Sequence, residues 1–188
     1  MKLSVIIISF QSNHLLKKIL NNFPKKYQII IVENSMLKST KKLEKKFKNT
    51  SVIIPNENLG YSKALNLAFK KCKNNFVLTL TPDVLINKYL ISNIEKVIYK
   101  FKQFTLLAPE YRNQKIYKNY TSFDNKPLNK KKIYNFRIEE VKEIDWCFCI
   151  LNKKKFSNSK ILDENFFMYF ETTDLCKKLL KLKRKMYI

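Results

Sequence analysis

The sequence has one glycine, one histidine and four cysteines among 188 residues, and these scarcities exclude several kinds of site. Because Gly60 stands alone, the chain lacks the glycine-rich loops that cradle phosphates in dinucleotide-binding proteins and P-loop NTPases. The sole histidine, His14, lies at the start of a predicted helix, so no Ser-His-Asp set exists. The cysteines form no C-x-x-C pair, which argues against a zinc site.

Long apolar segments are also missing. No run approaches the ~18 consecutive apolar residues that a membrane-spanning helix needs. The start of the chain leads directly into a strand-like run with no small-residue cleavage site behind it, so we expect no signal peptide. We therefore expect a cytoplasmic protein whose cysteines are free thiols, because disulfides are rare in reducing compartments.

Acidic residues are few relative to basic ones. The chain has 38 lysines and arginines against 15 aspartates and glutamates, a net charge of +23, which taken alone favours nucleic acid or an anionic membrane as partner. Nearly all of this charge is lysine, whereas proteins that read base edges favour the arginine fork. Since Lys, Asn, Ile, Phe and Tyr abound and share A/T-rich codons, we attribute the lysine content to nucleotide bias. The surface should still attract phosphates and anionic head groups.

Strand-like and helix-like patterns alternate about four times in the first half of the chain. The predicted strands cover residues 3–10, 27–32, 51–54, 76–80 and 104–108, and the predicted helices cover 13–23, 37–47, 62–72 and 87–101. This alternation predicts one α/β domain over residues 1–188, with a mainly parallel sheet and helices on both faces. An irregular insert is expected over 110–142, then a strand over 143–151, a helix over 172–182 and a strand from 185.

Carboxylates follow three of the first four predicted strands. They are Glu33, Glu57 and Asp83, and in a parallel sheet the ligand lies beyond the carboxyl ends of the strands. Two further acids, Glu171 and Asp174, are spaced to share one face at the start of the last helix. Each candidate has an ordinary alternative: Asp83 as a turn or cap residue, Glu33 as an exposed loop charge, and the later pair as acids in a first helical turn.

Five blocks occur in a recognisable order: SVIIISFQS, IIIVENS, NENLGYSKALNLA, FVLTLTPDV and LDENFFMYFETTDLCKKL. Together they span Ser4 to Leu179 and resemble family 2 glycosyltransferases, in particular the rhamnosyltransferase-like branch. The resemblance implies a GT-A fold and transfer of a sugar from a nucleoside diphosphate sugar to an acceptor hydroxyl with inversion, usually with Mg2+ or Mn2+. It also implies a saccharide or lipid-linked acceptor and a role in the synthesis of cell-surface polysaccharide or glycolipid.

The resemblance also implies roles for individual residues. By position, the residues beside the nucleotide are Ser9, Phe10, Glu33, Asn34, Ser35, Asn58, Gly60, Lys63 and Asn66. Asp83 matches the last residue of the family's metal-binding triplet. Glu171 matches the first acid of a Glu-Asp pair that supplies or supports the catalytic base, and Asp174 is the fallback one turn later. The aromatic stretch 166–170 is expected to exclude water and raise the pKa of such an acid.

Some positions depart from the family pattern. Thr172 stands where the second acid of the pair is usual, Gln11 replaces an asparagine, and Glu33 replaces an aspartate. Family members normally continue past the last helix. We therefore expect a nucleotide-binding half over residues 1–110 and an incomplete acceptor and catalytic half over 111–188.

Two alternatives to the enzyme stay open at this point. One is a catalytically weak relative that binds nucleotide sugars, and the other is a basic nucleic-acid-binding protein. For the enzyme and for its catalytically weak relative, the net charge predicts weak peripheral association with the anionic inner face of a membrane.

Overall fold

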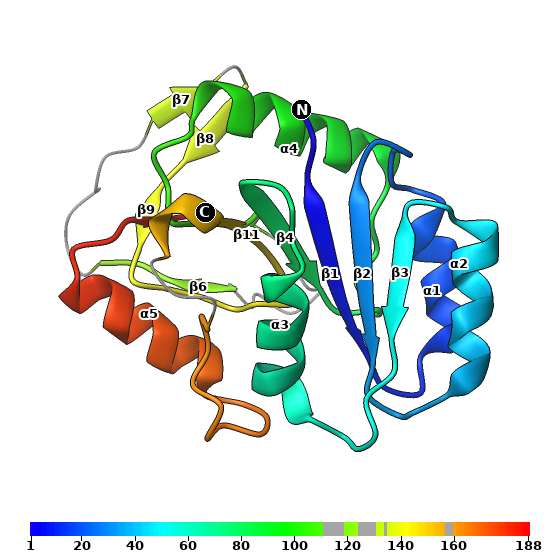
Figure 1. The fold of residues 1–188 in the computed structure, drawn as a ribbon. Helices are drawn as coiled ribbons and strands as arrows, with labels where there is room; N and C mark the ends of the chain where they lie inside the picture. The colour runs from blue at the N-terminus through cyan, green and yellow to red at the C-terminus, as the bar shows by residue number, and fades with distance from the viewer. Residues whose placement is uncertain (111–118, 124–130, 134, 157–159) are drawn as a thin grey trace.

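The structure is a computed structural model that describes residues 1–110, 119–123, 131–133, 135–156 and 160–188. This part of the chain contains an eight-stranded sheet in the order β3-β2-β1-β4-β11-β5-β12-β9 (Figure 1). Its strands are β1 (Ser4–Ser9), β2 (Gln28–Glu33), β3 (Thr50–Ile53), β4 (Phe76–Leu80), β5 (Leu106–Leu107), β9 (Glu140–Val141), β11 (Phe148–Asn152) and β12 (Met186–Tyr187). The helices are α1 (Asn13–Leu20), α2 (Lys42–Lys46), α3 (Gly60–Lys70), α4 (Lys88–Lys100) and α5 (Glu171–Lys181).

The first four strands are parallel and form one half of the sheet. Strand β1 lies between β2 and β4, and β3 pairs with β2 at the edge. The register sets Ser9 opposite Glu33 and Ile7 opposite Leu80. The carboxyl ends of β1, β2 and β4 therefore meet at one edge of the sheet, as the strand and helix alternation predicts.

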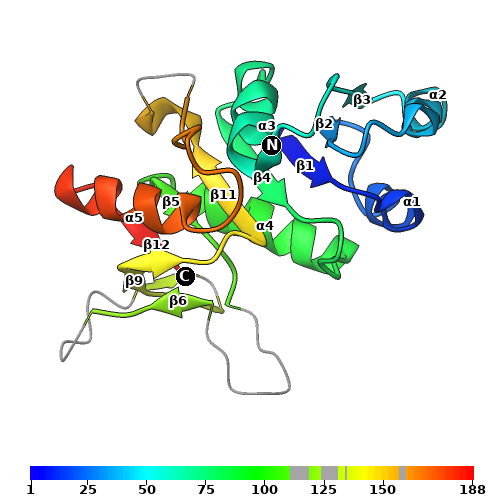
Figure 2. The same ribbon diagram turned by 90° about the horizontal axis from the view of Figure 1, so that it is seen from below.

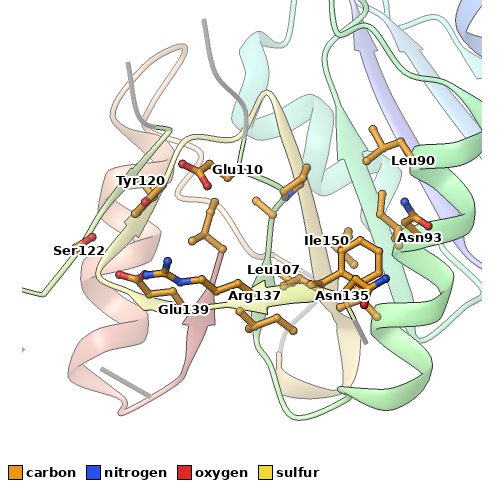
Figure 3. Close-up of a pocket in the computed structure, with 17 residues that line it drawn as sticks. Leu90, Asn93, Leu107, Glu110, Tyr120, Ser122, Asn135, Arg137, Glu139 and Ile150 are labelled. Carbon is orange, nitrogen blue, oxygen red and sulfur yellow. The ribbon is translucent and has the colours of Figure 1, made fainter. Parts of the chain in front are cut away.

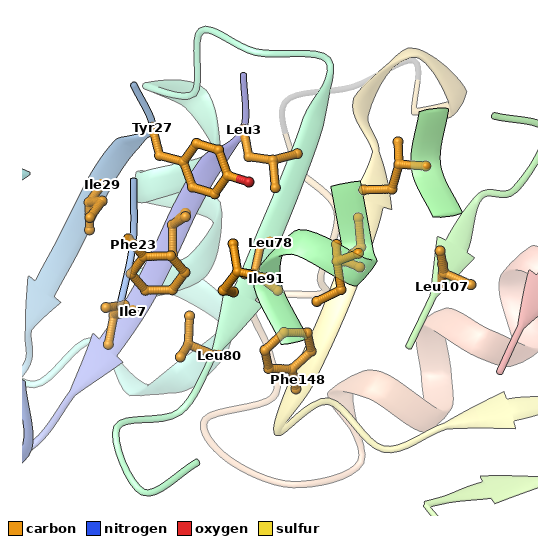
Figure 4. Close-up of a cluster of buried hydrophobic side chains, with 14 of the residues drawn as sticks. Leu3, Ile7, Phe23, Tyr27, Ile29, Leu78, Leu80, Ile91, Leu107 and Phe148 are labelled. Carbon is orange, nitrogen blue, oxygen red and sulfur yellow. The ribbon is translucent and has the colours of Figure 1, made fainter. Parts of the chain in front are cut away.

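Two apolar layers cover the two faces of the sheet. On one face, Val5 and Ile7 pack with the buried side chains of α1 and α4. On the other face, Ile6 packs with those of α3 and α5. Figure 4 shows the first layer, where Ile7, Leu80 and Ile91 converge from β1, β4 and α4. Strands buried on both faces explain why the apolar runs are continuous rather than alternating, and the predicted α/β fold with helices on both faces is confirmed.

Parallel pairing does not continue from β4 to the predicted strand over residues 104–108. Strand β11, from the second half of the chain, pairs antiparallel with β4 on one side and with the short β5 on the other. The predicted strand over 143–151 is in fact two strands. Its first part is β10 (Glu143–Ile144), which pairs with β6 (Tyr120–Thr121) in a separate ribbon. Sequence periodicity cannot reveal such an insertion, because it depends on contacts between distant segments.

The predicted helix over 37–47 is also only partly present. Residues Lys38–Lys41 form a 3-10 turn, and a short α2 follows. The hydroxyl of Thr40 donates to the side chain of Asn13 at 2.7 Å, which ties the turn to α1. Lysines recur four residues apart in this segment, and like charges at that spacing destabilise a longer helix.

The second half contains smaller elements where an irregular insert was predicted. They are β6, the hairpin of β7 (Lys131–Ile133) and β8 (Phe136–Ile138), and β9. Residues 111–118, 124–130 and 134 of the insert lie outside the described residues. A second 3-10 turn covers Lys153–Lys155. The predicted last strand is present as β12, between β5 and β9. Within the described residues, no helix has the length and apolar character needed to cross a bilayer.

Candidate active site

Glu33 ends β2 at the carboxyl edge and is fully buried, not an exposed loop charge. Its carboxylate accepts a hydrogen bond from the Ser9 hydroxyl at 2.8 Å and another from the Ser35 backbone N–H at 3.1 Å. The Ser35 hydroxyl also donates to it. The structure thus brings together three of the predicted nucleotide-binding residues from the ends of β1 and β2.

The start of α3 lies against the same edge. Gly60 begins this helix with a φ of +69°, a backbone conformation that L side chains rarely adopt. A Cβ at this position would overlap the backbone carbonyl oxygen of Phe167. The Asn34 side chain donates to the Gly60 carbonyl at 3.0 Å, and the Asn58 side chain accepts from the Gly60 N–H at 3.0 Å. The glycine is therefore required by a close approach of two backbones.

Asn66 is fully buried and joins α3 to a segment almost a hundred residues away. Its Oδ1 accepts from the backbone N–H groups of Ile161 at 2.9 Å and Leu162 at 3.1 Å. Its Nδ2 donates to the Leu162 carbonyl at 2.8 Å and to the Glu164 carboxylate at 3.2 Å. Because both heteroatoms are occupied, any contribution of Asn66 to nucleotide binding would act through the position of this segment.

A second contact with α3 lies further along the same segment, nearer to the start of α5. The Tyr61 N–H donates to the Phe167 carbonyl at 2.7 Å, and Figure 1 shows the chain before α5 beside the start of α3. We call residues 161–170 the docked segment. Tyr169 and Phe170 then adopt left-handed conformations, with φ of 69° and 64°. The docked segment thus fixes the position of the first residue of α5.

That first residue is Glu171, which is buried although it carries a carboxylate. One of its oxygens, Oε2, is buried without a hydrogen-bond partner among the described residues. Burial raises the pKa of Glu171 above its ordinary value. A buried carboxylate with one unpartnered oxygen and a raised pKa suits a group that takes up a proton.

Asp174, one turn later, has different surroundings. Its carboxylate forms an ion pair with Lys178 at 2.7 Å, and Lys178 also reaches Asp163 at 3.5 Å. The adjacent Thr173 hydroxyl donates to Glu143, which ties the start of α5 to β10. Asp174 is therefore already engaged with a cation, whereas Glu171 is not.

Tyr61 was not among the predicted site residues. Burial raises the pKa of its phenol, and the nearby Glu171 carboxylate raises it further. Tyr61 thus lies within electrostatic reach of Glu171 from the start of α3. Its place directly after the sole glycine was the available signal, but a tyrosine beside a helix start is common in apolar packing and does not by itself indicate a site.

Asp83 is exposed just after the carboxyl end of β4. The described residues contain no group of three or more His, Cys, Asp or Glu side chains that could hold a metal ion. Mg2+ often uses only one or two carboxylates together with substrate phosphates and water. Asp83 fits that donor set if a diphosphate supplies the remaining oxygens.

Several other predicted site residues are exposed on the surface. Phe10 and Lys63 are exposed, at the end of β1 and on the first turns of α3. In the aromatic stretch, Phe167, Met168, Tyr169 and Phe170 are each more than half exposed. These four side chains are largely open to solvent, and the prediction that the stretch excludes water from Glu171 stays a prediction.

A cavity of about 670 Å³ lies elsewhere, between α4, β5 and β8 (Figure 3). Apolar side chains from α4 and β5 line it together with Glu110, Arg137 and Glu139. Arg137 pairs with Glu139 at 3.5 Å. The cavity borders the α4 face of the sheet, whereas α3 and α5 cover the other face, so it does not contain Glu171.

Comparisons with known proteins agree with this fold. The family model described as "Glycosyl transferase family 2" matches residues 4–159. A crystal structure of residues 1–349 of S. aureus TarS is similar, with a TM-score of 0.72 and 19% identity, over 99% of this chain and 58% of that one. TarS is also solved with UDP-GlcNAc, at a TM-score of 0.68.

A second solved structure is similar to a comparable extent. The mannosyltransferase PcManGT from Pyrobaculum calidifontis, solved with GDP-Man and Mn2+, has a TM-score of 0.70 and 12% identity, over 98% of this chain and 53% of its own. The chain thus spans little more than half the length of these structures. A search of curated protein sequences finds no match.

Proposed function

Because this chain belongs to glycosyl transferase family 2, we propose that it transfers a sugar from a nucleoside diphosphate sugar to an acceptor hydroxyl, with inversion at the anomeric carbon. The observation that carries the proposal is Glu171, a buried carboxylate with one unpartnered oxygen. The docked segment is joined to the start of α3 by the hydrogen bond from the Tyr61 N–H to the Phe167 carbonyl, and Tyr61 lies within electrostatic reach of Glu171. The similar structures solved with UDP-GlcNAc and with GDP-Man support this class of donor.

The nucleotide would lie along the carboxyl edge, beyond β1 and β2. Ser9, Glu33 and Ser35 form a hydrogen-bonded set there, and the exposed Phe10 ring offers a face on which a base can stack. Lys63, exposed on α3, would contribute positive charge toward the diphosphate. Asn34, whose Oδ1 is buried without a partner among the described residues, has capacity for one more hydrogen bond.

A divalent cation, Mg2+ or Mn2+, would be held by Asp83 and the diphosphate. When bound, it would neutralise charge that develops on the departing diphosphate. Asp83 would hold the cation near the end of β4. The similar mannosyltransferase was solved in complex with Mn2+, which supports this choice.

The reaction proposed for this site is a single displacement. Glu171 removes the proton of the acceptor hydroxyl while the acceptor oxygen forms a bond to the anomeric carbon from the face opposite the diphosphate. The bond between the anomeric carbon and the diphosphate oxygen breaks, and its electron pair leaves with the diphosphate. General-base catalysis of this kind contributes roughly 10²–10⁴-fold. Asp174 is the weaker candidate because Lys178 already neutralises it.

One observation favours a second candidate, a relative that binds nucleotide sugars with little or no turnover. Thr172 occupies the position that the family usually gives to the second acid, and a hydroxyl is not a useful base at neutral pH. Measured transfer distinguishes the two functions, since both predict donor binding.

We make further proposals about the type of sugar, the acceptor, the biological role and the location of the protein. We propose a rhamnosyltransferase-like or other hexosyltransferase type, an acceptor that is a saccharide or lipid-linked, and a role in cell-surface polysaccharide or glycolipid synthesis. We also propose a cytoplasmic location with peripheral contact to the inner face of the membrane. The five sequence blocks and the charge of +23 support these proposals.

Donor binding is tested most simply by thermal shift. UDP, GDP and dTDP sugars are each added with and without Mn2+, and one of them should raise the melting temperature, since a ligand at ~100 times its Kd stabilises by about 2.7 kcal/mol. The Asp83→Asn variant should lose the Mn2+-dependent part of this shift. The matched control is Glu57→Gln, at another strand end, which should keep it. No shift with any donor, or an unchanged Mn2+ effect in Asp83→Asn, would contradict the assignment.

A further inference from the structure

A group of lysines at one end of the sheet has no role in the proposed reaction. We call Lys17, Lys38, Lys42, Lys45 and Lys46 the lysine face; all five are exposed. They lie on α1, the 3-10 turn and α2, and the hydrogen bond between Thr40 and Asn13 joins the turn to α1. Figures 1 and 2 both show α1 and α2 at the end of the molecule away from α5.

No carboxylate in this part of the chain is left to neutralise the lysine face. The segment 13–48 contains two acids, Glu33 and Glu44. Glu33 is buried and bonded to serines. Glu44 accepts from Lys41 at 2.9 Å and from the Val52 N–H. Among the described residues, none of the five lysines of the face has a carboxylate partner.

Two lysines of the face, on neighbouring helices, also lie close to each other. Lys46, on α2, has its pKa lowered by partial desolvation and by the charge of Lys17 on α1. Two ammonium groups held this close repel, and an external anion between them would relieve the repulsion. Nucleotide bias in the codons explains how many lysines the chain has. It does not explain why carboxylates are missing from this face while they pair with lysines elsewhere.

Exposed apolar side chains lie at the edge of the lysine face. Met36 and Leu37, directly before the 3-10 turn, are 42% and 40% exposed. Phe10 is 51% exposed in the neighbouring loop, which the Gln11 N–H joins to the Ser35 hydroxyl at 3.1 Å. Lysines beside exposed apolar side chains are typical of protein surfaces that bind the interface of an anionic bilayer.

We propose that the lysine face, with Met36 and Leu37 at its edge, docks this protein on an anionic lipid bilayer. Nucleic acid is the less suitable partner, because the segment 13–48 has no arginine to form bidentate contacts with phosphates or guanines. This docking assigns a surface to the peripheral membrane contact proposed above, and it does not depend on the proposed transfer activity. If that activity holds, docking would bring the carboxyl edge near lipid-linked acceptors, because Met36 and Leu37 follow β2 at that edge.

The test is co-sedimentation with vesicles, without donor or acceptor. Vesicles of phosphatidylcholine with about 30% phosphatidylglycerol are compared with phosphatidylcholine alone, because anionic lipid supplies the attraction. Replacing Lys38, Lys42, Lys45 and Lys46 by Gln should weaken binding to the anionic vesicles at least ~10-fold. The matched control replaces four exposed lysines from other surfaces, Lys71, Lys73, Lys96 and Lys181, and should weaken it less than ~3-fold.

Two further arms complete the test. Replacing Met36 and Leu37 by Ser should reduce the binding that remains at ~0.5 M salt, where charges are screened within a few ångströms. Equal losses in the two four-lysine variants would overturn the proposal, because binding would then follow net charge alone. Tighter binding to a DNA duplex than to the anionic vesicles, lost in the same variant, would assign the face to nucleic acid instead. Circular dichroism of each variant confirms folding.

Discussion

The two ends of this molecule differ in whether their lysine clusters include carboxylate partners. At the α1 and α2 end, the five lysines of the lysine face have no carboxylate partner among the described residues. At the α5 end, Lys178 pairs with Asp174 and Asp163, Lys160 with Glu164, and Lys185 with Glu140. A net charge of +23 therefore does not by itself show which lysines are available to an external anion. Unpaired lysines are available to an external anion, whereas paired ones hold the segment that carries Glu171.

The difference also separates two acids that look equivalent in the sequence. Glu171 and Asp174 are three residues apart in the first turn of α5. Lys178 engages Asp174, and no lysine engages Glu171 in the described part of the chain. The Lys178 ammonium therefore already occupies the carboxylate of Asp174, whereas Oε2 of Glu171 has no hydrogen-bond partner among the described residues.

The largest expected effect is on turnover at Glu171. Glu171→Gln should lower kcat by at least ~10²-fold and leave donor affinity nearly unchanged, because only proton transfer is lost. Asp174→Asn is the matched control and should lower kcat less than ~5-fold. Steady-state kinetics of sugar transfer measure both. A reversed order of the two variants would show that the ion pair with Lys178 does not decide which acid acts.

A second effect concerns the hydrogen bonds that dock the segment before α5. Asn66→Ala removes a fully buried amide and leaves three backbone groups and Glu164 without that partner. We expect a loss of about 3 kcal/mol in the free energy of unfolding and a kcat lowered by about 10-fold, because Glu171 is less well positioned. Chemical denaturation and kinetics provide the two values.

The control for Asn66 is Asn93→Ala, a buried asparagine on α4 at the other face of the sheet. It should leave kcat unchanged. An Asn66→Ala variant that loses stability but keeps full kcat would mean that the docked segment does not position Glu171. Vesicle binding should stay at the wild-type level in both variants, because neither asparagine belongs to the lysine face.

A smaller effect is expected at the helix start. Gly60→Ala places a Cβ against the Phe167 carbonyl and forces a left-handed conformation on alanine. The free energy of unfolding should fall by about 2 kcal/mol. Ser62→Ala is the control in the same helix. Its hydroxyl is buried without a partner among the described residues, so its removal should be neutral or stabilising.

Much of the fold could be predicted because β1, β2 and β4 are largely apolar runs and helical patterns separate the first four strands. Strand β11 could not be placed, since its position between β4 and β5 depends on pairing across about seventy residues. The five blocks selected Glu33, Gly60 and Glu171. They could not show that Gly60 accommodates Phe167, or that Asn66 bonds to the docked segment rather than facing solvent. Those roles arise only when α3 and the chain before α5 meet.

The central claim is that Glu171 acts as a buried, unpaired base, and the pH dependence of kcat tests it most directly. Its raised pKa means that Glu171 takes up a proton at a higher pH than an ordinary glutamate. On lowering the pH, kcat should therefore fall through an acidic limb whose midpoint lies above the ordinary value for glutamate, about 4.3. Glu171→Gln should lack this limb, and Asp174→Asn should keep it. An unchanged limb in Glu171→Gln would contradict the account.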